Sequence, residues 1–112
     1  MDGEFDTGLR REDLDPARPR PIETPWGSFA LYVVAGEVLA AQSFCPHLEG
    51  PLFQGTQVED TIVCPWHQWR FSLRTGARLD PAACLRFGED DLATCDVRTG
   101  PLGTLVLSPR SK

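Results

Sequence analysis

The amino-acid sequence predicts an all-β fold, an antiparallel sandwich or barrel made of short strands. Short runs rich in β-branched and aromatic residues recur along the chain, and glycines and prolines separate them. No window of the sequence shows sustained helical periodicity. With 112 residues, the chain is long enough for one domain and too short for two.

The first 27 residues are polar, and four prolines fall between positions 16 and 25. Because proline lacks an amide donor, this density excludes a long helix. We expect an extended arm with one short turn near residues 11–13. A partly disordered tail is the alternative interpretation.

A β-hairpin is expected next. Residues 28–34 (SFALYVV) form the first strand, Ala35-Gly36 makes the turn, and residues 37–42 (EVLAAQ) form the partner strand. A loop-rich insert follows at 43–75, and Thr75-Gly76 closes it as a turn. Further short strands are expected at 61–63, 69–72, 84–87, 92–97 and 104–107.

Composition narrows the function. The net charge is −5 and the pI is near 4.9, which disfavours a nucleic-acid partner because phosphate contacts need clustered Lys and Arg. Gly36 and Glu37 interrupt the longest apolar stretch, so no segment is expected to span a membrane. The acidic N-terminus lacks the features of a signal peptide, so we expect a cytoplasmic protein. In that reducing compartment, the four Cys favour metal or redox chemistry over disulfides.

Two short motifs hold both histidines of the chain. They are Cys45-Pro46-His47 and Cys64-Pro65-Trp66-His67, and sixteen residues separate His47 from Cys64. Two thiolates and two imidazoles suit a tetrahedral zinc or a [2Fe–2S] cluster with mixed ligands. Structural zinc usually takes both thiolates from one short knuckle, whereas here each motif supplies one Cys and one His. This split favours two adjacent irons, and zinc remains the alternative.

The sequences CPHLEGPLFQG at 45–55 and CPWHQWRFSLRTG at 64–76 resemble the two cluster-binding loops of Rieske proteins. The close resemblance covers residues 43–75. It implies one Rieske-type [2Fe–2S] cluster as cofactor, with Cys45 and Cys64 on the inner iron. His47 and His67 would then bind the outer, more exposed iron.

The resemblance also implies a Rieske-like arrangement of the single domain, 1–112. A base domain of antiparallel β-sheets, about 1–42 plus 76–112, would carry a small inserted cluster-binding subdomain at about 43–75.

Several positions predict a low reduction potential. High-potential respiratory Rieske proteins, which this chain resembles, carry a disulfide between their two loops, but the matching positions here hold Gly50 and Trp66. Those proteins also direct a Ser and a Tyr hydroxyl at cluster sulfurs, whereas this chain has Trp69 and Phe71. We expect a midpoint near the bottom of the Rieske range of about −150 to +300 mV, falling as pH rises past the imidazole pKa.

The resemblance implies an electron carrier rather than an enzyme, with no catalytic residues. It would be a Rieske-type ferredoxin that passes single electrons from a reductase to a terminal oxygenase or similar acceptor, and a monomer is favoured. A small Rieske-like subunit of an NAD(P)H-dependent nitrite reductase is the alternative, and a structural zinc-binding interaction module is another. The oxygenase itself is disfavoured because its mononuclear iron needs two further His, and this chain has none to spare.

Other residues carry weaker hypotheses. Cys84 and Cys95 are expected to be small buried residues on strands, with a mutual disulfide as the minor alternative. Pro81 either covers one side of the cluster or simply makes a turn. The acidic groups at 59–60 and 89–91 are ordinary solvated charges or a surface that steers a partner.

Overall fold

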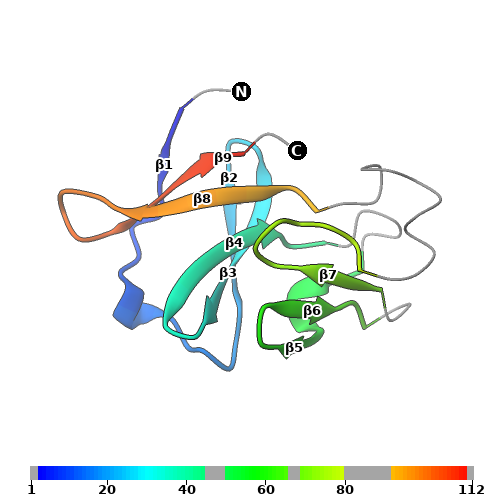
Figure 1. Cartoon of the computed structure of the whole chain (residues 1–112). Coiled ribbons are helices and arrows are strands. Elements are labelled where there is room, and N and C mark those ends of the chain that lie inside the picture. Colours follow the sequence, from blue (N-terminus) through cyan, green and yellow to red (C-terminus); the bar gives the residue numbers. More distant parts are fainter. Residues whose placement is uncertain (1–2, 45–49, 66–68, 80–91, 111–112) are drawn as a thin grey trace.

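The computed structural model describes residues 3–44, 50–65, 69–79 and 92–110. Across these ranges the chain forms nine strands in two antiparallel sheets and two single 3-10 turns, which confirms the predicted all-β class (Figure 1). No helix in this described part is long and apolar enough to cross a membrane.

The larger sheet has six strands in the order β1-β9-β8-β4-β3-β2, and the smaller has three in the order β5-β6-β7. The six strands are β1 (Phe5–Asp6), β2 (Arg20–Thr24), β3 (Gly27–Val34), β4 (Glu37–Gln42), β8 (Thr94–Thr99) and β9 (Leu105–Pro109). The smaller sheet contains β5 (Thr56–Val58), β6 (Thr61–Val63) and β7 (Arg70–Ser72).

The predicted hairpin at 28–42 is confirmed as β3 and β4. Ala35 and Gly36 both have positive φ, 50° and 83°, as a two-residue turn between twisted strands requires. The register pairs Leu31 with Ala40 and Tyr32 with Leu39. Alternate residues of both strands therefore point to opposite faces of the sheet.

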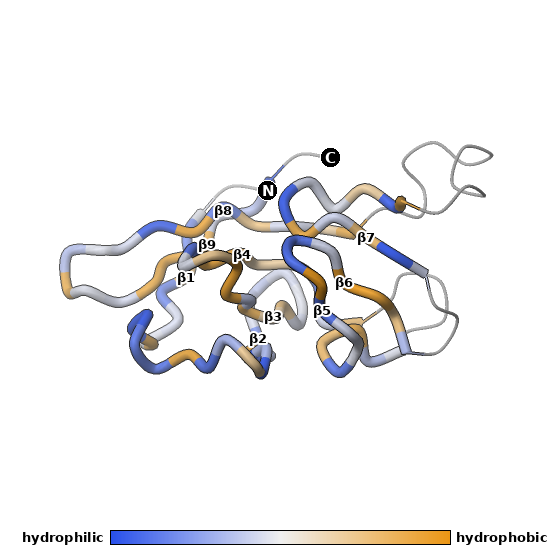
Figure 2. Tube along the Cα trace, turned by 60° about the horizontal axis from the view of Figure 1, so that its bottom comes forward, coloured by the Kyte–Doolittle hydropathy of each residue, from blue (hydrophilic) through white to orange (hydrophobic). Residues whose placement is uncertain are grey.

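Strand β3 is buried on both faces, which explains why its sequence is continuously apolar rather than alternating. One face joins the base core, whose buried members are Phe29, Leu31, Ala40, Cys95, Leu105 and Leu107. The other face joins the inter-sheet core, whose buried members are Ala30, Tyr32, Val34, Ala41, Leu52, Ile62, Cys64, Phe71, Leu73 and Leu92. Figure 2 shows hydrophobic stretches along β3 of the larger sheet and β6 of the smaller sheet, and both strands contribute residues to the inter-sheet core.

The proline-rich N-terminal segment is an extended arm with one 3-10 turn, η1 (Arg11–Asp13), as predicted. It is ordered because β1 pairs with β9 and β2 pairs with β3. The sequence did not predict these two strands, because β1 has only two residues and the prolines hide the pattern of β2. Strand β2 tolerates Pro21 because it lies at the sheet edge, where a missing amide donor breaks no ladder.

The strand expected at 92–97 begins two residues later, as β8. Leu92 and Ala93 instead form backbone hydrogen bonds with other segments. The Leu92 amide donates to the Gly76 carbonyl, and the Ala93 carbonyl accepts from the backbone amide of Gln42. The strand expected at 84–87 lies outside the described residues.

Candidate metal centre

Of the four predicted ligands, the described part of the chain includes Cys64. Cys45, His47 and His67 lie outside the described residues. The base of each motif loop is described, however, so the anchoring of both loops to the sheets can be followed.

The second loop continues the β6–β7 ladder. Val63 and Arg70 form its last register pair, and beyond them the Cys64 amide donates to the Trp69 carbonyl at 2.7 Å. Cys64 is a free thiol, 1% exposed, in the inter-sheet core. The backbone of this predicted ligand is therefore fixed, and its side chain faces the protein interior.

The first loop is held by Ser43, which is fully buried at the end of β4. Its amide donates to the Ser28 carbonyl at 3.0 Å, and the Ser28 hydroxyl donates to its hydroxyl at 2.8 Å. An isolated bridge between Phe44 and Pro51 closes the base of the loop. The Phe44 ring also meets Phe53 edge-on, with centroids 5.9 Å apart.

The two loop bases meet beside Cys64. The 3-10 turn η2 (Leu52–Gln54), which ends the first loop, places Leu52 in the same buried core as Cys64. The next residue, Gly55, lies so close to β6 that a Cβ there would overlap the Val63 carbonyl oxygen. This contact explains why the first motif ends in a glycine, because any side chain at Gly55 would push the first loop away from Cys64.

The glycine that closes the second motif has a comparable role. Gly76 has φ +81°, and a Cβ there would overlap the Leu92 carbonyl oxygen. The Leu92 amide in turn donates to the Gly76 carbonyl at 2.7 Å. The second loop is thereby tied to the segment that enters β8.

The resemblance implies that Phe71 and Trp69 stand where other Rieske proteins have hydroxyl groups that raise the potential of the cluster. Phe71 is fully buried in the inter-sheet core, and Trp69 packs against the same core. Neither side chain offers a hydroxyl group. Tyr32 does carry one in this core, and burial raises the pKa of its phenol well above the ordinary value, which keeps it protonated.

The motifs did not indicate a role for Arg78, which contacts Trp69 of the second motif. Its guanidinium carbon lies 3.1 Å from the centroid of the Trp69 ring, and its backbone forms a bridge with Phe71. The only sequence signal was its position two residues after the motif glycine, Gly76.

The described residues are compatible with a metal cluster, because the buried thiol of Cys64 lies where the bases of the two motif loops converge. Among residues 3–44, 50–65, 69–79 and 92–110, no group of three or more potential ligands gathers. That result follows from the location of Cys45, His47 and His67 outside these ranges.

The acidic group at 59–60 is partly neutralised. Asp60 lies 3.2 Å from the Arg74 guanidinium, which also pairs with Glu37 at 2.8 Å. Arg74 therefore links Asp60 in the β5–β6 turn to Glu37 on β4, and the charge of Asp60 is paired. The acidic residues at 89–91 lie outside the described residues, as does Pro81.

Cys95 is a buried free thiol on β8, as predicted. Burial, and then the nearby Asp96, raise the pKa of its thiol to about 11, against the opposing effect of Arg110. The thiol is therefore protonated and unreactive at neutral pH. Cys84 lies outside the described residues.

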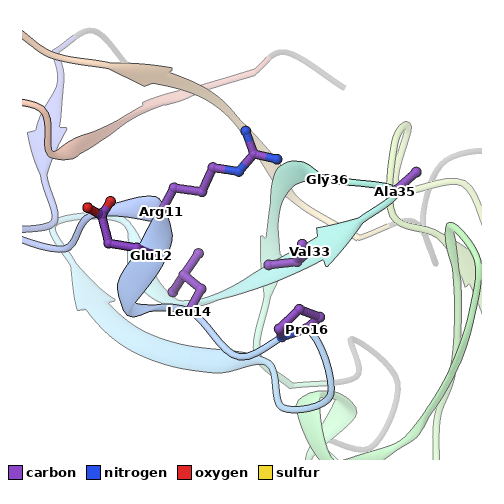
Figure 3. A pocket seen from close by; sticks show the side chains of 7 residues that line it. All are labelled: Arg11, Glu12, Leu14, Pro16, Val33, Ala35 and Gly36. Carbon is purple, nitrogen blue, oxygen red and sulfur yellow. The ribbon is translucent and has the colours of Figure 1, made fainter.

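A surface pocket of about 460 Å³ lies at the turn of the β3–β4 hairpin, the opposite end from Ser43 (Figure 3). None of its lining residues is a Cys or His, so it is not part of the metal centre. They are Arg11, Glu12, Leu14, Pro16, Val33, Ala35 and Gly36.

Comparison with known proteins bears on the family and on the fold. The family model described as "Rieske [2Fe-2S] domain" matches residues 8–87. The oxygenase component of 3-ketosteroid-9-alpha-monooxygenase from Mycobacterium tuberculosis is 33% identical over 98 residues, which cover 85% of this chain and 25% of that protein. The chain thus spans a quarter or less of the length of the steroid-monooxygenase components that it matches.

Two ferredoxins are similar over most of their length. The biphenyl dioxygenase ferredoxin subunit of Pseudomonas sp. (strain KKS102) is 28% identical over 74 residues, covering 65% of this chain and 68% of that protein. The ferredoxin of carbazole 1,9a-dioxygenase from Nocardioides aromaticivorans IC177 has a TM-score of 0.77 at 23% identity. That match covers 96% of this chain and 98% of the other. Because the identity is low, the match establishes the fold alone.

Proposed function

This chain belongs to the Rieske [2Fe–2S] domain family, and we propose that it works as a one-electron carrier built around that cluster. The family match confirms the resemblance and the Rieske-type cofactor predicted from the two motifs. The similarity to the carbazole dioxygenase ferredoxin confirms the predicted Rieske-like fold. When bound, such a cluster accepts and releases one electron.

In this proposal, Cys45 and Cys64 hold the inner iron, and His47 and His67 hold the outer iron. The convergence of the two loop bases on Cys64 carries the proposal. The thiol of Cys64 is buried together with Leu52 from the first loop, which suits a ligand on the protein side of a cluster. Imidazoles on the outer side would give the electron its shortest path to a docked protein.

The division of the domain is part of the same proposal. A base domain at about 1–42 plus 76–112 carries a cluster-binding subdomain at about 43–75. The sheets support this division, since β5, β6 and β7 form a separate sheet that packs on β3 and β4 through the inter-sheet core.

The carrier takes its electron from a reductase and delivers it to a terminal oxygenase or a similar acceptor. Similarity to ferredoxins of biphenyl and carbazole dioxygenases over most of their length supports this role. In this role the chain acts in the cytoplasm as a monomer and has no catalytic residues of its own.

A second candidate is the Rieske domain of an oxygenase component. The 33% identity to the steroid-monooxygenase component favours it. In that case the cluster would pass its electron within a larger assembly instead of between separate proteins. Both candidates need the same cluster, so they differ in the acceptor and not in the site.

The first experiment compares wild type with Cys64→Ser and Cys95→Ser after anaerobic purification. Both cysteines are buried free thiols, so the two variants remove matched groups. We expect two irons and two acid-labile sulfides per wild-type chain, loss of both in Cys64→Ser, and retention in Cys95→Ser. A colourless wild-type protein that binds one zinc would instead establish a structural zinc module.

The second experiment tests the carrier role with the loaded protein. Dithionite-reduced chain is mixed in a stopped-flow instrument with the oxidised oxygenase component of an aromatic-ring dioxygenase. We expect reoxidation of the chain to match reduction of the oxygenase. A reduced chain that transfers no electron to any oxygenase component tried, although its cluster is intact, contradicts the carrier proposal.

A further inference from the structure

Arg78 lies on the same face of the small sheet as the predicted ligand Cys64. The segment that contains it runs antiparallel to β7: Arg78 bridges Phe71, and the Leu79 amide donates to the Arg70 carbonyl at 2.7 Å. Directly paired residues in antiparallel strands point to the same face, and so do residues two apart on one strand. Phe71, Trp69 and Arg78 therefore share one face.

Cys64 lies on this face as well. Ile62 pairs with Phe71 across β6 and β7, and both side chains are buried in the inter-sheet core. Two residues further along β6, the Cys64 amide meets the Trp69 carbonyl, and the Cys64 side chain is buried in the same core. Cys64 thus lies opposite Trp69, whereas Arg78 lies opposite Phe71, two residues further along β7. Two strand spacings and one two-residue step separate the backbones of Cys64 and Arg78 by about 12 Å.

The guanidinium of Arg78 is held in this place. It stacks on the Trp69 ring, 3.1 Å from the centroid, and the Arg78 side chain is half-buried. Its backbone is fixed by the bridge to Phe71. A partly desolvated cation at such a distance is screened less than one in open solvent.

We propose that Arg78 sets the reduction potential of the cluster, as a fixed positive charge positioned by Trp69 beside the Cys64 side of the site. This inference rests on the proposed cluster site. Reduction adds one negative charge to the cluster, and a fixed cation nearby stabilises the reduced state more than the oxidised state. Arg78 therefore raises the midpoint, partly offsetting the missing hydroxyl groups at Trp69 and Phe71. A further partner of the guanidinium would lessen this shift without reversing its sign.

The test measures the midpoint potential of the loaded protein in wild type, Arg78→Gln and Arg78→Lys by anaerobic titration followed by visible absorption. Arg78→Gln removes the charge, and Arg78→Lys keeps it while losing the planar stack. Arg11→Gln is the matched control, because Arg11 lies at the far end of the β3–β4 hairpin (Figure 3).

We expect Arg78→Gln to shift the reduction equilibrium about three- to tenfold towards the oxidised state, where tenfold corresponds to about 59 mV for one electron. Arg78→Lys should stay close to wild type, and Arg11→Gln should not change. The Arg78→Gln shift should shrink at high ionic strength, as a charge effect requires.

Other outcomes separate the causes. Equal shifts in Arg78→Gln and Arg78→Lys would show that the stack on Trp69 matters and not the charge, which overturns the proposal. An unchanged midpoint in Arg78→Gln also overturns it. Absence of a cluster from the wild-type protein would overturn the proposed function itself, which is a different result from an intact cluster with an insensitive potential.

Discussion

Gly55 and Gly76 fix the two motif loops to the rest of the protein through backbone contacts that leave no room for a side chain. Each glycine is the last residue of one of the two Rieske-like motifs, 45–55 and 64–76. Their reason is visible only in the structure, where each faces a carbonyl oxygen of another segment, Val63 or Leu92. A sequence alone cannot show such a contact, because the contacting residues are distant along the chain.

Gly55→Ala should separate the first loop from β6. We expect the variant to lose about 1–3 kcal/mol of unfolding free energy, as for other overpacked sites, and to bind less iron per chain. Chemical denaturation and iron analysis measure both effects. Gly8→Ala is the control: its φ is +72° with open space around it, so it should lose stability through backbone strain alone and keep its iron.

Cys95 gives the protein a pH-dependent stability at alkaline pH. Its thiol pKa rises from 9.0 to about 11 on folding. Between those values the unfolded chain has released a proton that the folded chain still holds, so the free energy of unfolding falls as pH rises. Denaturant titrations from about pH 8 to about pH 11 should show a smaller fall for Cys95→Ala than for wild type. Parallel profiles for the two proteins would exclude this thiol as the cause.

At the scale of elements, strand β3 organises the fold because it belongs to both cores. The sequence predicted this hairpin well, since its strands are rich in apolar residues and its turn residues accept positive φ. Strands β1, β2 and β5 were not predicted. They are short edge strands of the two sheets, and what makes them strands is pairing with β9, β3 and β6 rather than a local pattern.

The two cores should differ in their effect on the cluster. Leu73 lies in the inter-sheet core with Cys64, and Leu107 lies in the base core. Replacing either by Ala should cost about 2–5 kcal/mol of unfolding free energy, as for other buried leucines. Only Leu73→Ala should also alter the visible circular dichroism of the cluster in the folded protein. A similar spectral change in Leu107→Ala would show that the cores are not independent in this respect.

At the scale of the whole molecule, a surface network links the two sheets. Arg74, which follows β7, pairs with Glu37 on β4 and with Asp60 at the β5–β6 turn. Its carbonyl accepts from the Arg110 guanidinium, and Arg110 pairs with Asp96 on β8 at 2.8 Å. The sequence predicted these acids only as a charged surface, because it could not show which cations lie opposite them.

Arg74→Met should lower the thermal unfolding midpoint slightly at low ionic strength. The pairs are exposed, so salt should screen them and bring wild type and variant together in about 1 M NaCl. Calorimetry at both salt concentrations measures this. A difference that persists in high salt would indicate that Arg74 acts through packing instead of charge.

The sequence predicted the four ligand residues of the candidate site but only part of the structure around them. Four ligand residues followed from two motifs, and they stay a prediction, because Cys45, His47 and His67 lie outside the described residues. The structure adds the convergence of the loop bases on Cys64 and the contact of Arg78 with Trp69 on the same face of the small sheet. Both depend on register between strands, which the motif spacing does not reveal.

The most direct test of a low-potential cluster with mixed ligands is a redox titration followed by electron paramagnetic resonance. We predict a rhombic signal with a low average g-value in the reduced protein and a midpoint below zero, within the lower part of the range of about −150 to +300 mV. A midpoint well above zero would contradict the role assigned to Trp69 and Phe71. A protein without iron or signal would contradict the cluster itself.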